Sequence, residues 1–411
     1  MNKKDILELK RRLKKNHCTF TRMCGCYVNS DKEILLTLNE TFLNLEEEEF
    51  YKYLEIAGKT LSGSLGNNLL ELSFPSEQED AGGKQQFLMG LKESKLKNEA
   101  LLDTFYHLVI ENYDYAGNYL ILVFHDAYDV MTRTHDNEEL DESEEVYEYL
   151  LAAVCPVTLS KPGLGYLETE NRIGSRMRDW VVGAPDTGFV FPAFSDRSTD
   201  IHSVMYYTKD TKEPHPEFME FILGCPARQT ATEKKTTFTD ILTGAISDDR
   251  KRERVMYDIH ETIQEMIDEK ALYAEENQEP DPIPLTSETI QDVLATSKVP
   301  EEIASRISAS YTEKLASEPP MADQLVDKKL LTSGAHKRRE EELMVEVQQL
   351  KDELTLIKGE APDSSECNVI VKVAPEKMEQ IHSQIIGGKR CIVIPLDENE
   401  RASVNGDEEL F

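Results

Sequence analysis

The residues best suited to chemistry lie between residues 172 and 202, where arginines gather in an acidic chain. Guanidinium groups bind phosphates and carboxylates through paired hydrogen bonds. The Gly-Ser step in this segment could present backbone N–H groups to the same anion. The segment therefore predicts a site for a phosphate- or carboxylate-bearing small molecule, formed by Arg172, Gly174, Ser175, Arg176, Arg178, Arg197, Asp200 and His202.

The same arginines have a structural interpretation, in which they form ion pairs that hold loops together. Four aspartates lie within reach along the chain: Asp179, Asp186, Asp196 and Asp200. Surface ion pairs of this kind are common and contribute about 0 to 1 kcal/mol each. Convergence of the guanidinium groups in a concave pocket would favour the ligand site, and dispersal into ion pairs would favour the structural role.

Two further clusters could carry chemistry but match no metal or catalytic motif. Cys18, Cys24 and Cys26 follow His17, yet a structural zinc site usually needs two pairs of ligands at wider spacing. We expect these cysteines in the core of a β-hairpin, and no bound metal. His125 and Asp126 follow an apolar stretch, where hydrolases often place catalytic groups, but a polar strand end explains them as well.

The absence of several well-defined motifs disfavours the enzyme classes that they mark. The chain has no G-x-S-x-G, no G-x-x-x-x-G-K-S/T, no H-E-x-x-H and no G-x-G-x-x-G. The sequence Ile385-Ile386-Gly387-Gly388 is similar to the phosphate-clamping loop of a KH module. A helix C-cap followed by a turn explains the glycine pair better. RNA binding through a KH-like C-terminal unit is kept as a second alternative function.

Composition and charge limit the possible partners. The 411 residues include 46 Lys and Arg and 78 Asp and Glu, so the net charge is −32, and the pI is near 4.7. Such a polyanion repels nucleic-acid phosphates and anionic membrane surfaces. The longest apolar runs, such as residues 119–124, are too short to span a bilayer. Seven cysteines, an odd number, indicate reduced thiols, so we expect a cytoplasmic protein. The sequence indicates no cofactor.

Periodicity in the first half of the chain predicts alternating helices and strands. Residues 2–15 and a segment starting near Asn44 have apolar residues at helical spacing, and Asn44 and Glu47 have the spacing of a capping box. Residues 19–28 and 33–38 are predicted to form a β-hairpin. A helix over residues 87–109 and a buried strand over 119–124 follow. The acidic run 136–148 is expected to be a loop or a solvated helix start, and residues 146–159 an edge strand because of Pro156 and Pro162.

The second half is mainly helical. Helices are expected over residues 252–273 and 286–317. Leu343, Val347, Leu350, Leu354 and Ile357 are separated by 4, 3, 4 and 3 residues, which is the a/d spacing of a coiled coil over about two heptads. We expect this stripe to be covered by another helix, within the chain or in a homodimer formed through Leu343 to Ile357. Residues 368–373, 375–386 and 391–396 are predicted to form strand, helix and strand.

These elements predict an α+β fold with several domains. A mixed domain with antiparallel strands and helices covers residues 1–240, and a helical segment covers 241–274. An acidic proline-rich linker follows at 275–285, because EENQEPDPIP has the composition of an exposed spacer. A helical region with the short heptad helix covers 286–360, and a small βαβ-type unit covers 366–406.

Four blocks of the chain resemble a known protein family. They are LELKRRLKKNHCTFTRMCGCYVN, YLEIAGKTLSGSLGNNLLEL, NRIGSRMRDWVVGAPDTGFVFPAFSDRSTDIHSVMYYTKD and KVAPEKMEQIHSQIIGGKRCIVIPLDEN. They are similar to a bacterial family from anaerobic Gram-positive organisms that is catalogued only as a domain of unknown function. The resemblance spans nearly the whole chain and implies a bacterial cytosolic protein. It implies no activity, cofactor or catalytic residue.

The sequence therefore leaves two main hypotheses of function. The first is a non-enzymatic interaction or regulatory protein, favoured by acidity, linkers, the heptad stripe and the missing catalytic motifs. Its partner would be another protein. The alternative is an enzyme or binding protein that recognises an anionic small molecule between Arg172 and His202.

Overall fold

The computed structural model describes residues 1–14, 16–133, 139–273, 282–358, 380–395, 402–404 and 407–409. The chain divides into two compact units, Met1–Gly334 and Ala335–Phe411. The first unit combines a large antiparallel sheet with helices, which confirms the predicted α+β fold class.

An eight-stranded antiparallel sheet organises the first unit. Its strand order is β2 (Ile34–Thr41), β1 (Arg22–Val28), β4 (Asn118–Arg133), β5 (Glu139–Leu159), β9 (Thr187–Phe191), β12 (Ser203–Thr208) and β3 (Leu69–Ser73), with β8 (Trp180–Val182) beside β5. The predicted hairpin is confirmed, because β1 pairs with β2 in antiparallel register.

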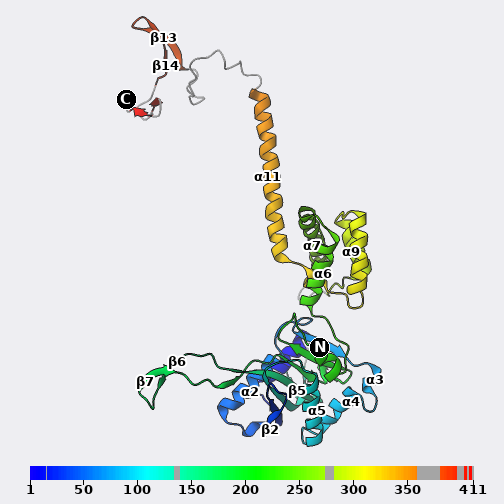
Figure 1. Ribbon diagram of the computed structural model, residues 1–411. Coiled ribbons are helices and arrows are strands. Elements are labelled where there is room, and N and C mark those ends of the chain that lie inside the picture. Colours follow the sequence, from blue (N-terminus) through cyan, green and yellow to red (C-terminus); the bar gives the residue numbers. More distant parts are fainter. Residues whose placement is uncertain are drawn as a thin grey trace. The chain divides into compact units, whose positions relative to one another are not determined.

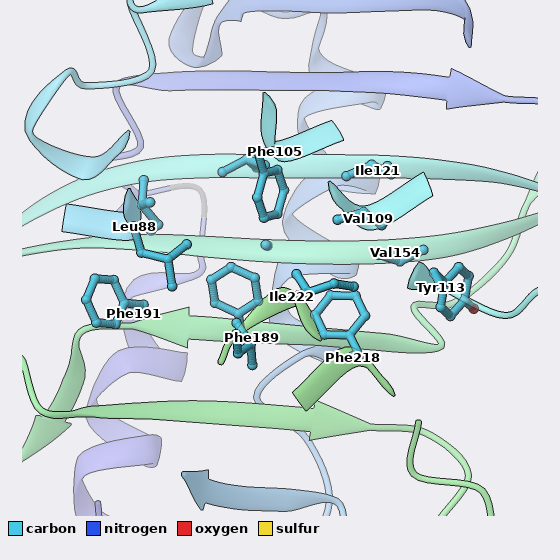
Figure 2. Close-up of a cluster of buried hydrophobic side chains, with 14 of the residues drawn as sticks. Leu88, Phe105, Val109, Tyr113, Ile121, Val154, Phe189, Phe191, Phe218 and Ile222 are labelled. Atoms are coloured by element: carbon cyan, nitrogen blue, oxygen red, sulfur yellow. The ribbon is translucent and has the colours of Figure 1, made fainter. Parts of the chain in front are cut away.

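One face of the sheet is covered by α4 (Lys84–Glu93), α5 (Glu99–Asn112) and the short π-helical segment η2 (Phe218–Ile222). Leu88, Phe105 and Phe218 lie against Phe189 and Phe191 of β9 in this core (Figure 2). The helix predicted over residues 87–109 is two helices, because Lys95 and Leu96 between them have positive φ and break the helical backbone. The short helix α3 (Ser76–Glu79) precedes them.

The opposite face packs against α1 (Lys3–Arg12), the 3₁₀ turn η1 (Phe42–Asn44) and α2 (Glu47–Lys59). Both predicted helices are confirmed, since Leu9 of α1 and Leu54 of α2 are buried in this second core. The predicted capping box at Asn44 is wrong. Asn44 belongs to η1, and Glu46 takes the N-cap position of α2 without a side-chain cap.

A third core is entirely helical. It is formed by α6 (Ala231–Ala245), α7 (Asp249–Leu272), α8 (Ser287–Thr296), α9 (Glu301–Lys314) and α10 (Ala322–Leu325). Helix α6 runs across the domain boundary predicted at residue 240. Most of the predicted linker, residues 275–281, lies outside the described residues.

Strand β5 differs from its prediction in position and length. It lies between β4 and β9 and is not an edge strand. Pro156 is tolerated because β9 pairs only with residues 150–154, before the proline is reached. The acidic run also differs, because its residues from Glu139 onward belong to β5 and are not loop or helix. Residues 134–138 lie outside the described residues.

The second unit contains most of α11 (Lys328–Lys358) and two hairpins, β13 (His382–Ile386) with β14 (Lys389–Val393) and β15 (Ala402–Val404) with β16 (Asp407–Glu409). The helix predicted to reach Ile386 is wrong over its last five residues. Gly387 and Gly388 have φ of 57° and 81°, which is the geometry of a two-residue hairpin turn and not of a helix C-cap. The predicted strand 368–373 lies outside the described residues.

Within the described parts of the chain, no helix combines the length and the apolarity needed to cross a membrane.

Candidate interaction site

A two-stranded β-ribbon, residues 156–183, leaves the sheet where β5 passes Pro156. Beyond this point β9 no longer pairs with β5, and β8 takes its place opposite residues 157–159. The Gly183 N–H donates to the Pro156 carbonyl over 2.8 Å, so the ladder continues without a break. Beyond this point the outgoing and returning strands of the ribbon pair with each other.

The ribbon extends to a tip at residues 168–171. The Ser160 N–H donates to the Asp179 carbonyl at 2.8 Å, and the Arg176 N–H to the Gly163 carbonyl at 2.9 Å. The terminal hairpin joins β6 (Leu164–Leu167) to β7 (Arg172–Ser175), which pair only with each other. From residue 160 to residue 167 an extended strand covers roughly 25 Å. Figure 1 shows β6 and β7 extending away from the sheet and from the helices that cover it.

One face of the ribbon is apolar. Tyr166 and Ile173 are directly opposite each other, and Leu164 lies two residues from Tyr166, so all three side chains share a face. They are 59, 65 and 78% exposed. Nearer the sheet, Met177 continues this face by alternation and is exposed, whereas Trp180, also exposed, alternates onto the opposite face. Large apolar side chains therefore follow the ribbon without a covering layer.

The opposite face carries guanidinium groups. Gly165 pairs with Gly174, and the missing side chains leave room that Arg176 and Arg172 fill, respectively. Arg172 forms an ion pair with Glu170. The ribbon is thus amphipathic, apolar on one face and basic on the other.

Arg178, farther from the tip, donates from Nε to the Ser160 carbonyl and ties the two strands together. Arg172, Arg176 and Arg178 therefore lie on one ribbon, as three of the four arginines of the predicted anion site.

Gly174 and Ser175 of the predicted anion site belong to β7 of the ribbon. Its other members, Arg197, Asp200 and His202, lie at or just after the hairpin of β10 (Ala193–Ser195) and β11 (Ser198–Asp200). Arg197 donates from Nε to Glu8 at 3.2 Å and from Nη2 to the Met131 carbonyl. His202 contacts Glu79, with 2.8 Å between Nδ1 and Oε1. The ion pairs described for Arg172 and Arg197 are to glutamates, whereas the structural interpretation expected aspartates. Convergence of the four arginines on one ligand stays a prediction.

The hydrolase-like candidate at His125 forms a buried hydrogen-bond chain. His125 Nδ1 lies 2.7 Å from Thr21 Oγ1, and Nε2 lies 2.9 Å from Glu148 Oε1. Burial lowers the pKa of His125 more than Glu148 raises it. Asp126 accepts from the hydroxyls of Thr19 and Tyr149. These contacts join β4, β5 and the segment before β1, which is a structural role.

Hollows of about 670 and 510 Å³ occur at the start of α5 and between α5 and β2. Neither is lined by His125, Asp126 or any residue of the predicted anion site. These two hollows therefore lie away from the residues for which the sequence suggested chemistry.

Cys24 and Cys26 lie in the hairpin core as expected, whereas Cys18 precedes β1 and is only half-buried. Cys24 and Cys26 alternate with Gly25 along β1, and both are buried in the first core. Burial raises the pKa of the Cys26 thiol to about 12. Among the described residues no group of three His, Cys, Asp or Glu side chains could hold a metal ion.

Sequence analysis missed the apolar face of the ribbon. A signal was present, since Gly165-Tyr166 and Ile173-Gly174 flank a polar turn in mirrored order, a glycine beyond a large apolar residue on each side. The segment interpreted from the sequence begins at residue 172, which separates β7 from its hairpin partner β6.

A family model described as "Domain of unknown function (DUF4317)" matches residues 1–406. No curated protein matches the chain.

Proposed function

Because the chain belongs to the DUF4317 family, whose description assigns no activity, we propose a function from the geometry: the ribbon over residues 156–183 is an arm that binds a protein partner. The observation that carries this proposal is the uncovered apolar face of the hairpin formed by β6 and β7. An isolated two-stranded hairpin is at best marginally stable in water. Burial of Leu164, Tyr166 and Ile173 against a partner would stabilise both the hairpin and the complex.

The residue types of the arm support this role. Protein interfaces are enriched in Trp, Tyr, Met and Arg, and their energetic centres in Trp, Tyr and Arg. The arm contains the single Trp of the chain together with Tyr166, Met177 and three arginines. Trp180 is 55% exposed, although tryptophan is usually well buried.

Charge indicates the chemistry of the partner. The segment 160–183 has four basic residues, Lys161, Arg172, Arg176 and Arg178, and three acidic ones, within a chain of net charge −32. A surface that offers an apolar groove edged with carboxylates would complement both faces of the arm. A nucleic acid would meet repulsion from the rest of the chain.

A cytoplasmic location belongs to the same proposal. Six cysteines among the described residues are free, and four of them are buried thiols. Unpaired thiols are typical of compartments that keep cysteine reduced.

The test compares two matched double variants in affinity capture from native cells. Tyr166→Ser/Ile173→Ser removes the apolar face of the arm. Leu35→Ser/Leu36→Ser removes two side chains of similar exposure on β2, at the edge of the sheet. The arm variant should lose the captured protein, and the β2 variant should retain it after nuclease treatment.

Binding is then measured by calorimetry with the purified partner. The arm variant should raise Kd at least about tenfold, since two buried apolar side chains contribute more than 1.4 kcal/mol together. The β2 variant should leave Kd unchanged. Equal capture by both variants, or loss of capture on nuclease treatment, would show that the arm is not a protein-binding element.

A further inference from the structure

Helix α11 presents an uncovered apolar stripe in the second unit. The helix covers 31 residues, Lys328–Lys358. Leu343, Val347 and Leu350 share one stripe of it, at heptad spacing, and are 47, 48 and 52% exposed. Most helical stability in proteins comes from packing of an apolar face, so a long helix with such a stripe exposed lacks its usual stabilisation.

The heptad register identifies what fits this stripe. With Leu343 at d, the seam continues with Val347 at a and Leu350 at d, and the sequence repeats the pattern with Leu354 at a and Ile357 at d. In parallel coiled coils, valine at a with leucine at d, as at Val347 and Leu350, favours two strands, whereas the Leu354 and Ile357 pair is of the type found in larger bundles. The a and d residues bear on the number of helices, and the flanking charges bear on their orientation.

The flanking charges favour a parallel arrangement of the two helices. Glu346 and Glu353 occupy g positions, and Lys351 and Lys358 occupy the e positions that follow. In a parallel, in-register pair each g residue faces the e residue of the next heptad on the other helix, which places Glu346 opposite Lys351 of the partner subunit. An antiparallel pair would place glutamate opposite glutamate and lysine opposite lysine. The chain is thus complementary to itself in the parallel orientation alone.

We propose that a second copy of this chain covers the stripe, and that the protein is a homodimer held by a parallel two-stranded coiled coil over residues 343–357. The seam begins at Leu343, because the preceding a position is Glu340, which disfavours an apolar seam. Five a/d layers form a short coiled coil, so dimerisation should depend on protein concentration.

The first test is the solution mass of the full chain by sedimentation equilibrium over about 1 to 100 µM. The wild type should approach twice 46.8 kDa. Leu350→Lys should raise the dimer Kd about a hundredfold, because it removes two buried leucines and places two lysines in the seam. The matched control is Val345→Lys, at an exposed f position of the same helix, which should remain dimeric.

The second test reports orientation. Lys351→Glu should weaken the dimer about tenfold, because it places glutamates opposite Glu346 on both sides of the seam. Adding Glu346→Lys should restore the dimer, since the pairs are again complementary in the parallel arrangement. Circular dichroism of each variant confirms that the fold is kept.

A wild type that stays monomeric to 100 µM, or a dimer unaffected by Leu350→Lys, would overturn the proposal. A dimer without charge-swap rescue would exclude the parallel orientation. The arm variant Tyr166→Ser/Ile173→Ser should leave the mass unchanged, so failure of this proposal is distinguishable from failure of the arm.

Discussion

At the scale of single residues, the strongest polar arrangement is a chain of hydrogen bonds around His215. Its Nε2 lies 2.9 Å from Asp186 Oδ2, and its Nδ1 lies 2.9 Å from Glu217 Oε1. The Tyr113 hydroxyl donates to the same Asp186 oxygen over 2.7 Å. This chain joins the start of β9, the end of α5 and the segment before η2.

Opposing effects set the pKa values of His215 and Asp186 in this chain of hydrogen bonds. Burial lowers the pKa of His215, but its hydrogen bonds to Asp186 and Glu217 outweigh burial, so the net pKa lies above the ordinary 6.5. Burial raises the pKa of Asp186, but hydrogen bonds from His215 and Tyr113 outweigh it, so the net pKa lies below the ordinary 3.8. The imidazolium form is therefore favoured by folding.

The pH dependence of stability follows from these directions. A raised histidine pKa gives stabilisation that is complete below pH 6.5 and is lost as pH rises through the folded-state pKa. The lowered pKa of Asp186 gives stabilisation above pH 3.8 that is lost in stronger acid. We expect His215→Gln to lower the free energy of unfolding by about 1 to 3 kcal/mol at pH 6, and by clearly less at pH 8, in urea denaturation.

The matched control is His202→Gln. Glu79 also raises the pKa of His202, but this side chain is exposed. Its substitution should therefore change the pH profile only slightly. An equal loss at pH 6 and pH 8 for His215→Gln would contradict the proposed charge on the imidazole.

Residue-level prediction succeeded where contacts are local and failed where they are distant. The sequence correctly places Cys24 and Cys26 in a hairpin core, because alternation along a strand determines which side chains are buried. It could not place Arg197, whose partner Glu8 is 189 residues away in the chain. No local pattern encodes such a contact.

At the scale of elements, β5 and the ribbon form one continuous strand that is buried in the sheet at one end and exposed to solvent at the other. Residues 150–154 of β5 pair on both sides and carry buried side chains, whereas the chain beyond Leu159 has a single neighbour and is largely exposed. Hydrogen bonds in such an exposed segment open at a small fraction of the global unfolding free energy. Local stability therefore falls along one continuous hairpin.

Hydrogen exchange followed by mass spectrometry should resolve this gradient. We expect amides of residues 160–179 to exchange at least about a hundredfold faster than those of 150–154, because local opening frees only the ribbon. Peptides from both segments of the same sample provide the internal comparison. Similar protection of both segments in the isolated chain would contradict a separately opening arm, and the purified partner should slow exchange only in the arm.

Helices and strands were predicted correctly where the spacing of apolar residues is regular, and missed where it is not. Helices α1, α2, α8 and α9 were expected because each has apolar residues on one side and packs that side into a core. Strand β5 was missed over Glu139 to Glu148, where acidic residues conceal the alternation of a strand. The end of the predicted C-terminal helix was wrong because Ile385 and Ile386 fit either period, and only the glycine pair distinguishes a hairpin.

At the scale of the whole molecule, charge is the dominant property. A net charge of −32 makes the compact state repel itself, and salt screens this repulsion. Raising NaCl from about 10 mM to about 150 mM at pH 7.5 should therefore increase the melting temperature, by about 2 °C or more. The few surface ion pairs lost to screening contribute less.

Repeating the measurement near pH 4.7 is the control, because the net charge is close to zero there. The salt effect should then vanish or change sign. A melting temperature that falls with salt at pH 7.5 would show that attractive ion pairs outweigh the overall repulsion.

The pairing of β3 with β12 has a consequence for synthesis on the ribosome. Ser73 pairs with Ser203, which follows it by 130 residues. At about 5 to 20 residues per second, β3 emerges roughly 7 to 26 s before the strand that covers it. Throughout that interval Leu69, Leu70 and Leu72, which are buried in the finished sheet, have no strand neighbour. When β3 emerges, five of the eight strands of its sheet are therefore still to be translated.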